Sequence, residues 1–172
     1  MHQGALLNAS PLPEVSLETI TASGKPIIVL DQVTDPRNIG AIIRAAMVFG
    51  AGGLIMTRHN SPASGGALAK TASGALEKMP LVRVANLARC LESLTEAGYL
   101  TCGLDEEGTQ WLGDIPRDQP IACVMGAEGK GLRRLTKENC AQLVRLTATD
   151  ASSFATLNVA TATAVALYEI VR

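Results

Sequence analysis

The sequence predicts an α/β fold in which a mostly parallel sheet is covered by helices on both faces. Short apolar runs alternate along the chain with longer segments that have helical periodicity. The run 121–125 is apolar at every position, as expected of a strand that is buried on both faces. Hydrophobic residues make up 47% of the chain and aromatic residues only 3%, which indicates an aliphatic, alanine-rich core.

The predicted strands and helices alternate through one domain, residues 25–172. Each strand is an apolar run bounded by glycine, proline or polar residues, and the helix at 87–97 carries leucines on one face. The predicted strands are 27–30, 53–56, 82–84, 99–104, 121–125 and 143–146. The predicted helices are 39–49, 68–78, 87–97, 133–140 and 158–171. Residues 1–24 have no clear periodicity and are predicted to be a linker.

Composition excludes several classes of protein. With 15 basic and 16 acidic residues the net charge is −1, so that RNA or DNA binding would need a local basic patch or another domain. The four cysteines are far apart and there are two histidines, which disfavours a metal site or a disulfide scaffold. No segment approaches the roughly 18 apolar residues of a membrane span, and there is no signal pattern. We therefore expect a cytoplasmic protein with no metal and no membrane partner.

The segment 31–44 is the first candidate site, because it joins the strand 27–30 to a helix. Open α/β sheets place their chemistry at such βα junctions. Asp35 and Asn38 are candidates to cap the helix, and Arg44, about two turns further on, could reach back over the end of the strand. A purely structural role, as caps and a solvated arginine, is equally consistent with this segment alone.

Two later segments are also candidate sites. Residues 124–132 place three glycines and Glu128 directly after a buried strand, without the Walker A or dinucleotide-binding spacing. Residues 156–169 open the last helix with a hydroxyl and an amide, Thr156 and Asn158. Each segment alone is also explained as a tight turn and as a capped packing helix.

In order and context, the three segments resemble the motifs of the SpoU (TrmH) family of RNA ribose 2′-O-methyltransferases. They match D-x-V-x-D-P-x-N-x-G-x-x-x-R, a strand followed by G-x-E-G-x-G, and S-L-N-V-x-x-A. The resemblance runs from Pro26 to Arg172. Residues 80–89 and 125–136 are similar to the branch that methylates a guanosine of bacterial 23S ribosomal RNA. His2-Gln-Gly4 resembles the linker that follows the N-terminal RNA-binding domain of that branch, so that we expect 1–24 to be a linker remnant after such a domain.

The resemblance implies a C-terminal deep trefoil knot, the SPOUT or α/β-knot fold, which forms a pocket for S-adenosylmethionine. It also implies a homodimer whose active site lies at the subunit interface. By position, the expected cofactor-binding residues are Gly103, Gly126, Leu146, Thr156 and Leu157. The implied partner is RNA, most specifically 23S ribosomal RNA or its precursor.

The implied reaction is an in-line attack of a ribose 2′-hydroxyl on the sulfonium methyl group. Arg44 matches the catalytic arginine of the family; because a guanidinium stays protonated, we expect it to orient a phosphate and stabilise the alkoxide. Asn38 is expected to position the ribose or a partner side chain, Glu128 to hold Arg44 or contact substrate, and Asn158 to hold the third motif and the ribose. A phosphate-binding patch is predicted at Arg37, Lys130, Arg133 and Arg134, where ordinary helix-surface charge is the competing explanation.

Three departures from the family concern the wall of the cofactor pocket. Leu146-Thr-Ala148 stands where Ile-Pro-Met is usual, the connection to the third motif is two residues longer, and Thr156 replaces a serine while keeping the hydroxyl. These departures are the only support for a non-catalytic, knotted RNA-binding dimer. The sequence also leaves open a transfer RNA methyltransferase and an unrelated nucleotide-binding α/β domain.

Overall fold

The computed structural model describes residues 12–59, 66–146 and 157–172. The elements, in chain order, are α1 (Leu17–Thr21), β1 (Ile27–Asp31), α2 (Pro36–Val48), β2 (Gly53–Thr57), α3 (Gly66–Ala72), β3 (Leu81–Val84), α4 (Leu87–Glu96), β4 (Leu100–Leu104), β5 (Gln110–Trp111), η1 (Leu112–Asp114), β6 (Ile121–Gly126), α5 (Arg134–Asn139), β7 (Gln142–Arg145) and α6 (Val159–Val171). The strands form one seven-stranded sheet in the order β3-β2-β1-β6-β4-β7-β5, and every pairing is parallel. The predicted parallel α/β architecture is confirmed.

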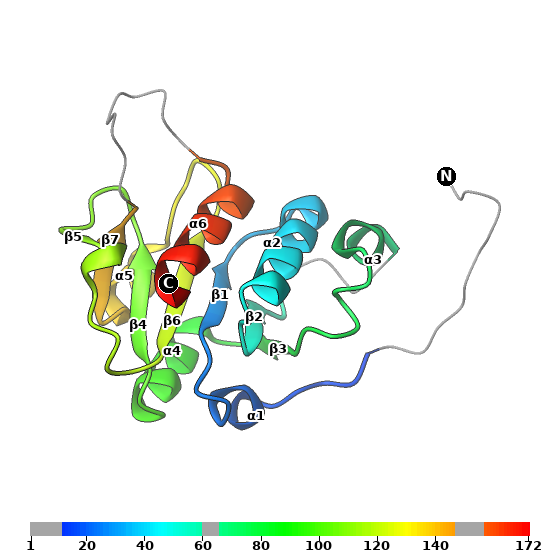
Figure 1. The fold of residues 1–172 in the computed structure, drawn as a ribbon, viewed down its shortest axis with the longest axis horizontal. Coiled ribbons are helices and arrows are strands. Elements are labelled where there is room, and N and C mark those ends of the chain that lie inside the picture. Colours follow the sequence, from blue (N-terminus) through cyan, green and yellow to red (C-terminus); the bar gives the residue numbers. More distant parts are fainter. Residues whose placement is uncertain (1–11, 60–65, 147–156) are drawn as a thin grey trace.

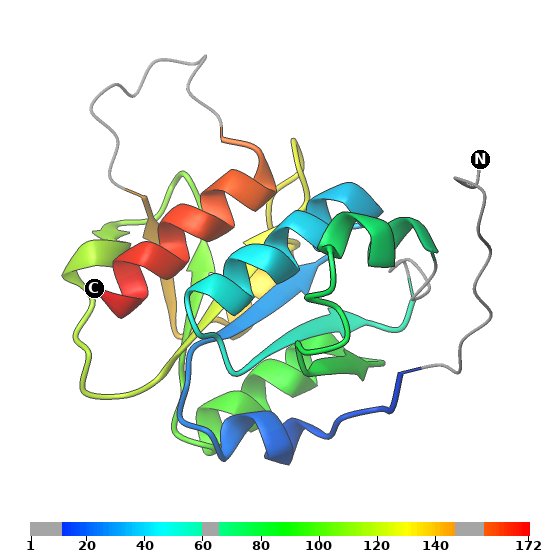
Figure 2. The ribbon, with the colours of Figure 1, turned by 45° about the vertical axis from the view of Figure 1, so that its right-hand side comes forward.

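Helices cover both faces of this sheet (Figures 1 and 2). Alternate residues of a strand point to opposite faces, and β1 shows this clearly. Ile28 and Leu30 pack in a core with α2, α3 and α6, whereas Ile27 and Val29 pack in a second core with α1 and α4. All five residues of β1 are buried, which explains why its sequence is a continuous apolar run that ends in Asp31.

The structure differs from the sequence-based prediction in four short elements. The segment predicted to be a linker contains α1, whose Ile20 is 1% exposed in the second core. The strand β5 and the 3₁₀ turn η1 are too short to produce a periodic pattern. The helix predicted over 68–78 is α3, which ends at Ala72 because Ser73 and Gly74 adopt positive φ angles of 50° and 80°.

The strand order creates a topological switch point between β1 and β6. The connection after β1 runs over one face of the sheet to β2, which lies on one side of this pair. The connection after β6 runs over the opposite face to β7, which lies on the other side of the pair. In open α/β sheets, ligands bind at the carboxyl ends of strands at such a point. The pairing of Asp31 with Gly126 marks this position in the molecule.

Two further expectations concern the chain as a whole. No helix among the residues that the structure describes is long and apolar enough to cross a membrane. The expected trefoil knot depends on the path of residues 147–156, which lie outside the described residues.

Candidate functional site

The first motif begins α2 at the carboxyl end of β1. The Asp35 carboxylate accepts a hydrogen bond from the backbone N–H of Arg37 at 2.8 Å, and Pro36 occupies the first helical position. The prediction that Asp35 caps this helix is therefore confirmed. Asn38 does not cap it; its Nδ2 instead donates to Oε1 of Glu128 at 3.2 Å.

The second motif is a tight loop that holds Glu128 beside β1. Gly129 and Gly131 have φ angles of 73° and 63°, a region that side chains disfavour, and the N–H of Gly131 donates to the Ala127 carbonyl at 2.8 Å. A Cβ on Gly126 would lie 2.3 Å from the carbonyl carbon of Gly131. These glycines are required for the loop to close on itself, which fixes the position of Glu128.

The third motif meets the same carboxylate at the start of α6. Asn158 caps this helix, its Oδ1 accepting from the N–H of Thr161 at 2.8 Å. The N–H of Val159 donates to Oε1 of Glu128 at 3.4 Å. A carboxylate at the N-terminus of a 13-residue helix is also favoured by the helix dipole. One oxygen of Glu128 thus joins all three motifs, which is the central feature of the site.

Arg44 is not part of this cluster within the chain. It lies six residues after Asn38 on α2, about 9 Å further along the helix axis. Its side chain is exposed, as are those of Met47 and Val48 on the following turn. Glu128 is held by Asn38 and Val159, and it does not hold Arg44 within the same chain.

Arg133 makes a contact that the sequence did not predict. Its backbone N–H and its Nε donate to the two oxygens of Asp31, at 2.9 and 2.6 Å. The Asp31 side chain is 0% exposed and that of Arg133 is 46% exposed. A single carboxylate at the end of an apolar strand is the signal that could have revealed the need for a buried partner.

The other residues of the predicted phosphate patch lie on the surface. Arg37 pairs with Asp35 at 3.1 Å, and Arg134 pairs with Glu138 one turn later at 2.6 Å. Lys130 is exposed in the glycine loop. Three of the four predicted cations therefore have a carboxylate partner, and their roles toward RNA stay predictions.

The residues expected to contact the cofactor lie near the carboxyl ends of three adjacent strands. Gly103 is in β4, Gly126 ends β6 and Leu146 follows β7, in the order β6-β4-β7. Leu157, 53% exposed, precedes α6, and Thr156 lies outside the described residues. These positions offer backbone groups and apolar side chains and no charge, which suits an adenosyl group. Close packing also favours a glycine at position 103, because a Cβ there would lie 2.9 Å from the sulfur of Cys140.

Two side chains around the site have shifted pKa values, Asp35 and Lys137. Hydrogen bonds from the side chain and backbone of Arg37 lower the pKa of the exposed Asp35. A 2.6 Å ion pair with Asp105, after β4, raises the pKa of Lys137. Among the residues that the structure describes, no three cysteine, histidine or acidic side chains gather as metal ligands would.

An open parallel sheet with polar side chains gathered at its switch point defines a cofactor- or nucleotide-binding α/β enzyme. The family model described as "SpoU rRNA Methylase family" matches residues 25–168, which contain all three motifs. The chain belongs to this family. The family predicted from the three motifs is therefore confirmed.

Proteins of similar sequence and structure agree with this assignment. The chain is 42% identical to the 23S rRNA (guanosine-2'-O-)-methyltransferase RlmB of Burkholderia sp., over 99% of this chain and 70% of that protein. It is 42% identical to RlmB of Pseudomonas putida, over 100% of this chain and 71% of that protein. The crystal structure of the SpoU methyltransferase AviRb from Streptomyces viridochromogenes, in complex with AdoMet, superposes with a TM-score of 0.82 at 31% identity. That match covers 93% of this chain and 62% of AviRb, less than two thirds of its length.

Proposed function

We propose that this chain uses S-adenosylmethionine to methylate the 2′-hydroxyl of a guanosine ribose in 23S ribosomal RNA, a cytoplasmic reaction. The observation that carries the proposal is the Glu128 carboxylate, which binds Asn38 of the first motif and the N-terminus of α6 in the third. The site therefore brings the family motifs to the switch point of the sheet. The 42% identity to RlmB over the whole chain supports the choice of substrate.

The cofactor is proposed to lie against the carboxyl ends of β4, β6 and β7. Gly103, Gly126, Leu146 and Leu157, with Thr156, would surround its adenosyl group with backbone and apolar atoms. When bound, S-adenosylmethionine supplies an electrophilic methyl group. We further propose that the chain has the trefoil knot of the family, a proposal that family membership supports.

The described residues suit the tasks of orienting and stabilising a reacting ribose. Both donors to Glu128 bind Oε1, so that Oε2 is the oxygen proposed to accept a hydrogen bond from substrate. Asn158 uses its Oδ1 to cap α6, and its amide N–H groups are proposed to bind the ribose. Holding the hydroxyl in line and surrounding the developing alkoxide with fixed donors are the main contributions that such a site makes.

Arg44 is proposed to act in a homodimer, at the site of the partner subunit. It lies beside an apolar surface formed by α2 and α6, which run next to each other on one face of the sheet (Figure 2). This surface includes the exposed side chains of Met47, Val48, Tyr168 and Val171. Phe49 and Tyr168 join the two helices through an edge-to-face ring contact at 6.4 Å. A second copy covering this surface would carry Arg44 across the interface, where its permanent positive charge suits a phosphate and a developing alkoxide.

The proposal is tested by incubating the chain with 23S ribosomal RNA and isotope-labelled S-adenosylmethionine. Mass spectrometry of the digested RNA should find one 2′-O-methylguanosine that carries the label. A calorimetric titration with S-adenosylmethionine, with S-adenosylhomocysteine for comparison, should show saturable binding. A folded dimer that binds RNA but no cofactor at millimolar concentration would instead support a non-catalytic RNA-binding protein.

A further inference from the structure

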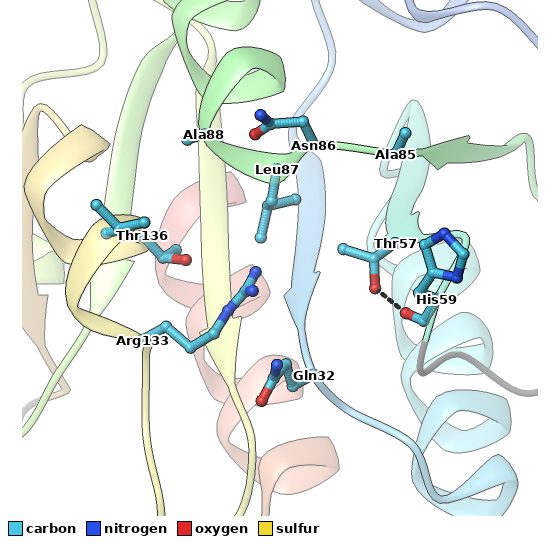
Figure 3. A pocket seen from close by; sticks show the side chains of 10 residues that line it. Gln32, Thr57, His59, Ala85, Asn86, Leu87, Ala88, Arg133 and Thr136 are labelled. Atoms are coloured by element: carbon cyan, nitrogen blue, oxygen red, sulfur yellow. Dashed lines mark hydrogen bonds between the residues drawn. The ribbon is translucent and has the colours of Figure 1, made fainter.

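A polar hollow of about 290 Å³ lies at the carboxyl edge of the sheet, beside the ends of β1, β2 and β3 (Figure 3). Arg133 extends into it from one side, and Thr57 and His59 lie opposite. The residues that line it are Gln32, Thr57, His59, Ala85, Asn86, Leu87, Ala88, Arg133, Leu135 and Thr136. None of these described residues is acidic. The Glu128 cluster uses none of them.

Arg133 is the fixed cation of this hollow. The bonds from its backbone N–H and its Nε to Asp31 hold the guanidinium in one orientation, while Asp31 itself is fully buried. A guanidinium has five N–H donors, so that the two Nη groups remain for a ligand. Since 46% of the Arg133 side chain is exposed, these donors are accessible from the hollow.

Further donors surround the guanidinium. Asn86 caps α4 by accepting from the N–H of Arg89 at 3.2 Å, which leaves its own amide N–H groups free to donate. The first helical N–H groups, those of Leu87 and Ala88, have no partner inside the helix. The Thr57 hydroxyl donates to the His59 carbonyl at 2.5 Å, which fixes the residue that carries the imidazole. A hollow that is rich in donors and lacks carboxylates suits an anion.

The apolar part of the hollow indicates more than a bare anion. Leu135, 57% exposed on α5, and Leu87 both line it. These side chains suit the carbon surface of a ribose or a base. Donors beside an apolar wall, in a space of this size, fit one nucleotide of a polynucleotide chain.

Two residues that line the hollow, Gln32 and Arg133, lie on the connections after β1 and β6 that also lead to the Glu128 cluster. Gln32 follows β1 and precedes Asn38, with a φ angle of 58°, a backbone conformation that is strained for a residue other than glycine. Arg133 follows Glu128 on the loop after β6. The cluster lies where α2 and α6 begin, whereas the hollow lies toward α4, on the other face of the sheet. An RNA strand that crosses the edge at β1 would reach both.

We propose that this hollow binds a nucleotide of the RNA substrate next to the methylated one, with its phosphate on Arg133 and its sugar or base against Leu87 and Leu135. The inference rests on the proposed function, because it takes RNA as the substrate. The hollow holds the strand and does not touch the reacting atoms. It should therefore affect RNA affinity and not the rate of methyl transfer at saturating RNA.

The test is an Asn86→Asp substitution, which introduces a carboxylate at the hollow and keeps α4 capped, since aspartate caps as well as asparagine. Gln119→Glu is the matched control, an exposed position before β6 at the opposite edge of the sheet. Asn86→Ser keeps a neutral cap. The dissociation constant of a 23S ribosomal RNA fragment should rise about 10-fold or more for Asn86→Asp, because like charges are then brought together. It should change less than about threefold for Gln119→Glu. Asn86→Ser loses the amide donors but adds no charge, so that it should weaken RNA binding less than Asn86→Asp does. The single-turnover rate at saturating RNA should stay the same in all three, because the hollow does not touch the reacting atoms.

Equal RNA affinity of Asn86→Asp and Gln119→Glu would overturn the proposal. A wild-type chain that binds the RNA without methylating it would contradict the proposed function, and the comparison of affinities would still decide on the hollow. A wild-type chain that binds no RNA would overturn both. Saturable binding of S-adenosylmethionine and an unchanged melting temperature confirm that each variant is folded.

Discussion

Asn38 and Glu128 lie 90 residues apart in the sequence, and the amide of the first donates to the carboxylate of the second at 3.2 Å. The same carboxylate oxygen accepts from the N–H of Val159, a further 31 residues along the chain. Through this one side chain, the start of α2, the loop after β6 and the start of α6 are held together. The site is therefore a product of the tertiary fold.

The Asn38–Glu128 hydrogen bond should be necessary for methyl transfer. Asn38→Asp replaces the donor by a second carboxylate and should push Glu128 out of position. We expect the rate of methyl transfer to fall about 10²-fold, the usual cost of losing one fixed polar group at a reacting centre. Single-turnover assays measure this effect. Gln119→Glu makes the same change of charge away from the site and should keep the wild-type rate. If Asn38→Asp also keeps the wild-type rate, the hydrogen bond has no catalytic importance.

Arg44 should matter for the reaction and not for the cofactor. Arg44→Ala should abolish methyl transfer, because it removes the charge that we propose to stabilise the developing alkoxide. Calorimetry should show nearly unchanged binding of S-adenosylmethionine. Arg89→Ala, on α4 at the other face of the sheet, is the control and should remain active. Loss of transfer and of cofactor binding together would contradict the assigned role.

The ion pair between Arg133 and Asp31 should be important for stability. Arg133→Ala leaves a fully buried carboxylate without its charged partner, which should lower the free energy of unfolding by about 3–5 kcal/mol. Urea denaturation measures the change. Arg134→Ala removes only the exposed pair with Glu138 and should cost about 1 kcal/mol or less.

A second substitution separates the charge of Asp31 from the packing of Arg133. In the background of Arg133→Ala, Asp31→Asn removes the unpaired charge and should recover part of the lost stability. If the double variant is no more stable than Arg133→Ala, the loss comes from packing and not from the buried charge.

The apolar surface of α2 and α6 should mediate dimerisation. Val48→Lys places a charge in that surface, and burying it without a partner is costly. The folded chain should tolerate this change, because a cation near the C-terminus of a helix is favourable. Analytical ultracentrifugation should find the wild type dimeric and this variant monomeric at micromolar concentration. Leu135→Lys, on the exposed face of α5, should remain dimeric; a wild type that is already monomeric would refute the shared site.

The buried thiols should make stability depend on alkaline pH. Burial raises the pKa of Cys90 and of Cys102 to about 11, against 9.0 for a free thiol. The folded state therefore keeps these protons to higher pH than the unfolded chain, so that the free energy of unfolding should fall as pH rises from about 9 toward 11. Urea titrations at several pH values test this. At pH 8, iodoacetamide should label Cys90 and Cys102 in the unfolded protein much faster than in the native one.

The sequence predicted the features that depend on local signals. The apolar runs located six strands, and their continuity predicted a parallel sheet with two covered faces. Asp35 was predicted as a candidate cap because it lies at the junction between a strand and a helix, and the glycines after β6 indicated a tight loop. The family was predicted from three motifs whose order and spacing are visible in the chain.

The features that the sequence did not predict depend on contacts between distant residues. The partner of Asp31 is Arg133, which follows a different strand and has no local signal that separates it from an ordinary surface cation. Asn38 was also a candidate cap, and only the fold directs its amide to Glu128. In α1, burial of Ile20 against the second core stabilises a helix of five residues, too short to show periodicity.

The adjacency of β1 and β6 also has a consequence for how the protein folds. The central pair of the sheet joins strands from early and late in the chain, so that β1 cannot complete its pairing until β6 has been synthesised. Contacts of such large sequence separation slow folding. During translation, one edge of β1 stays unpaired until β6 emerges. Strands with an exposed, unpaired edge are prone to aggregate during this time. A pulse-labelling hydrogen-exchange experiment should therefore find the amides of β1 among the last to become protected.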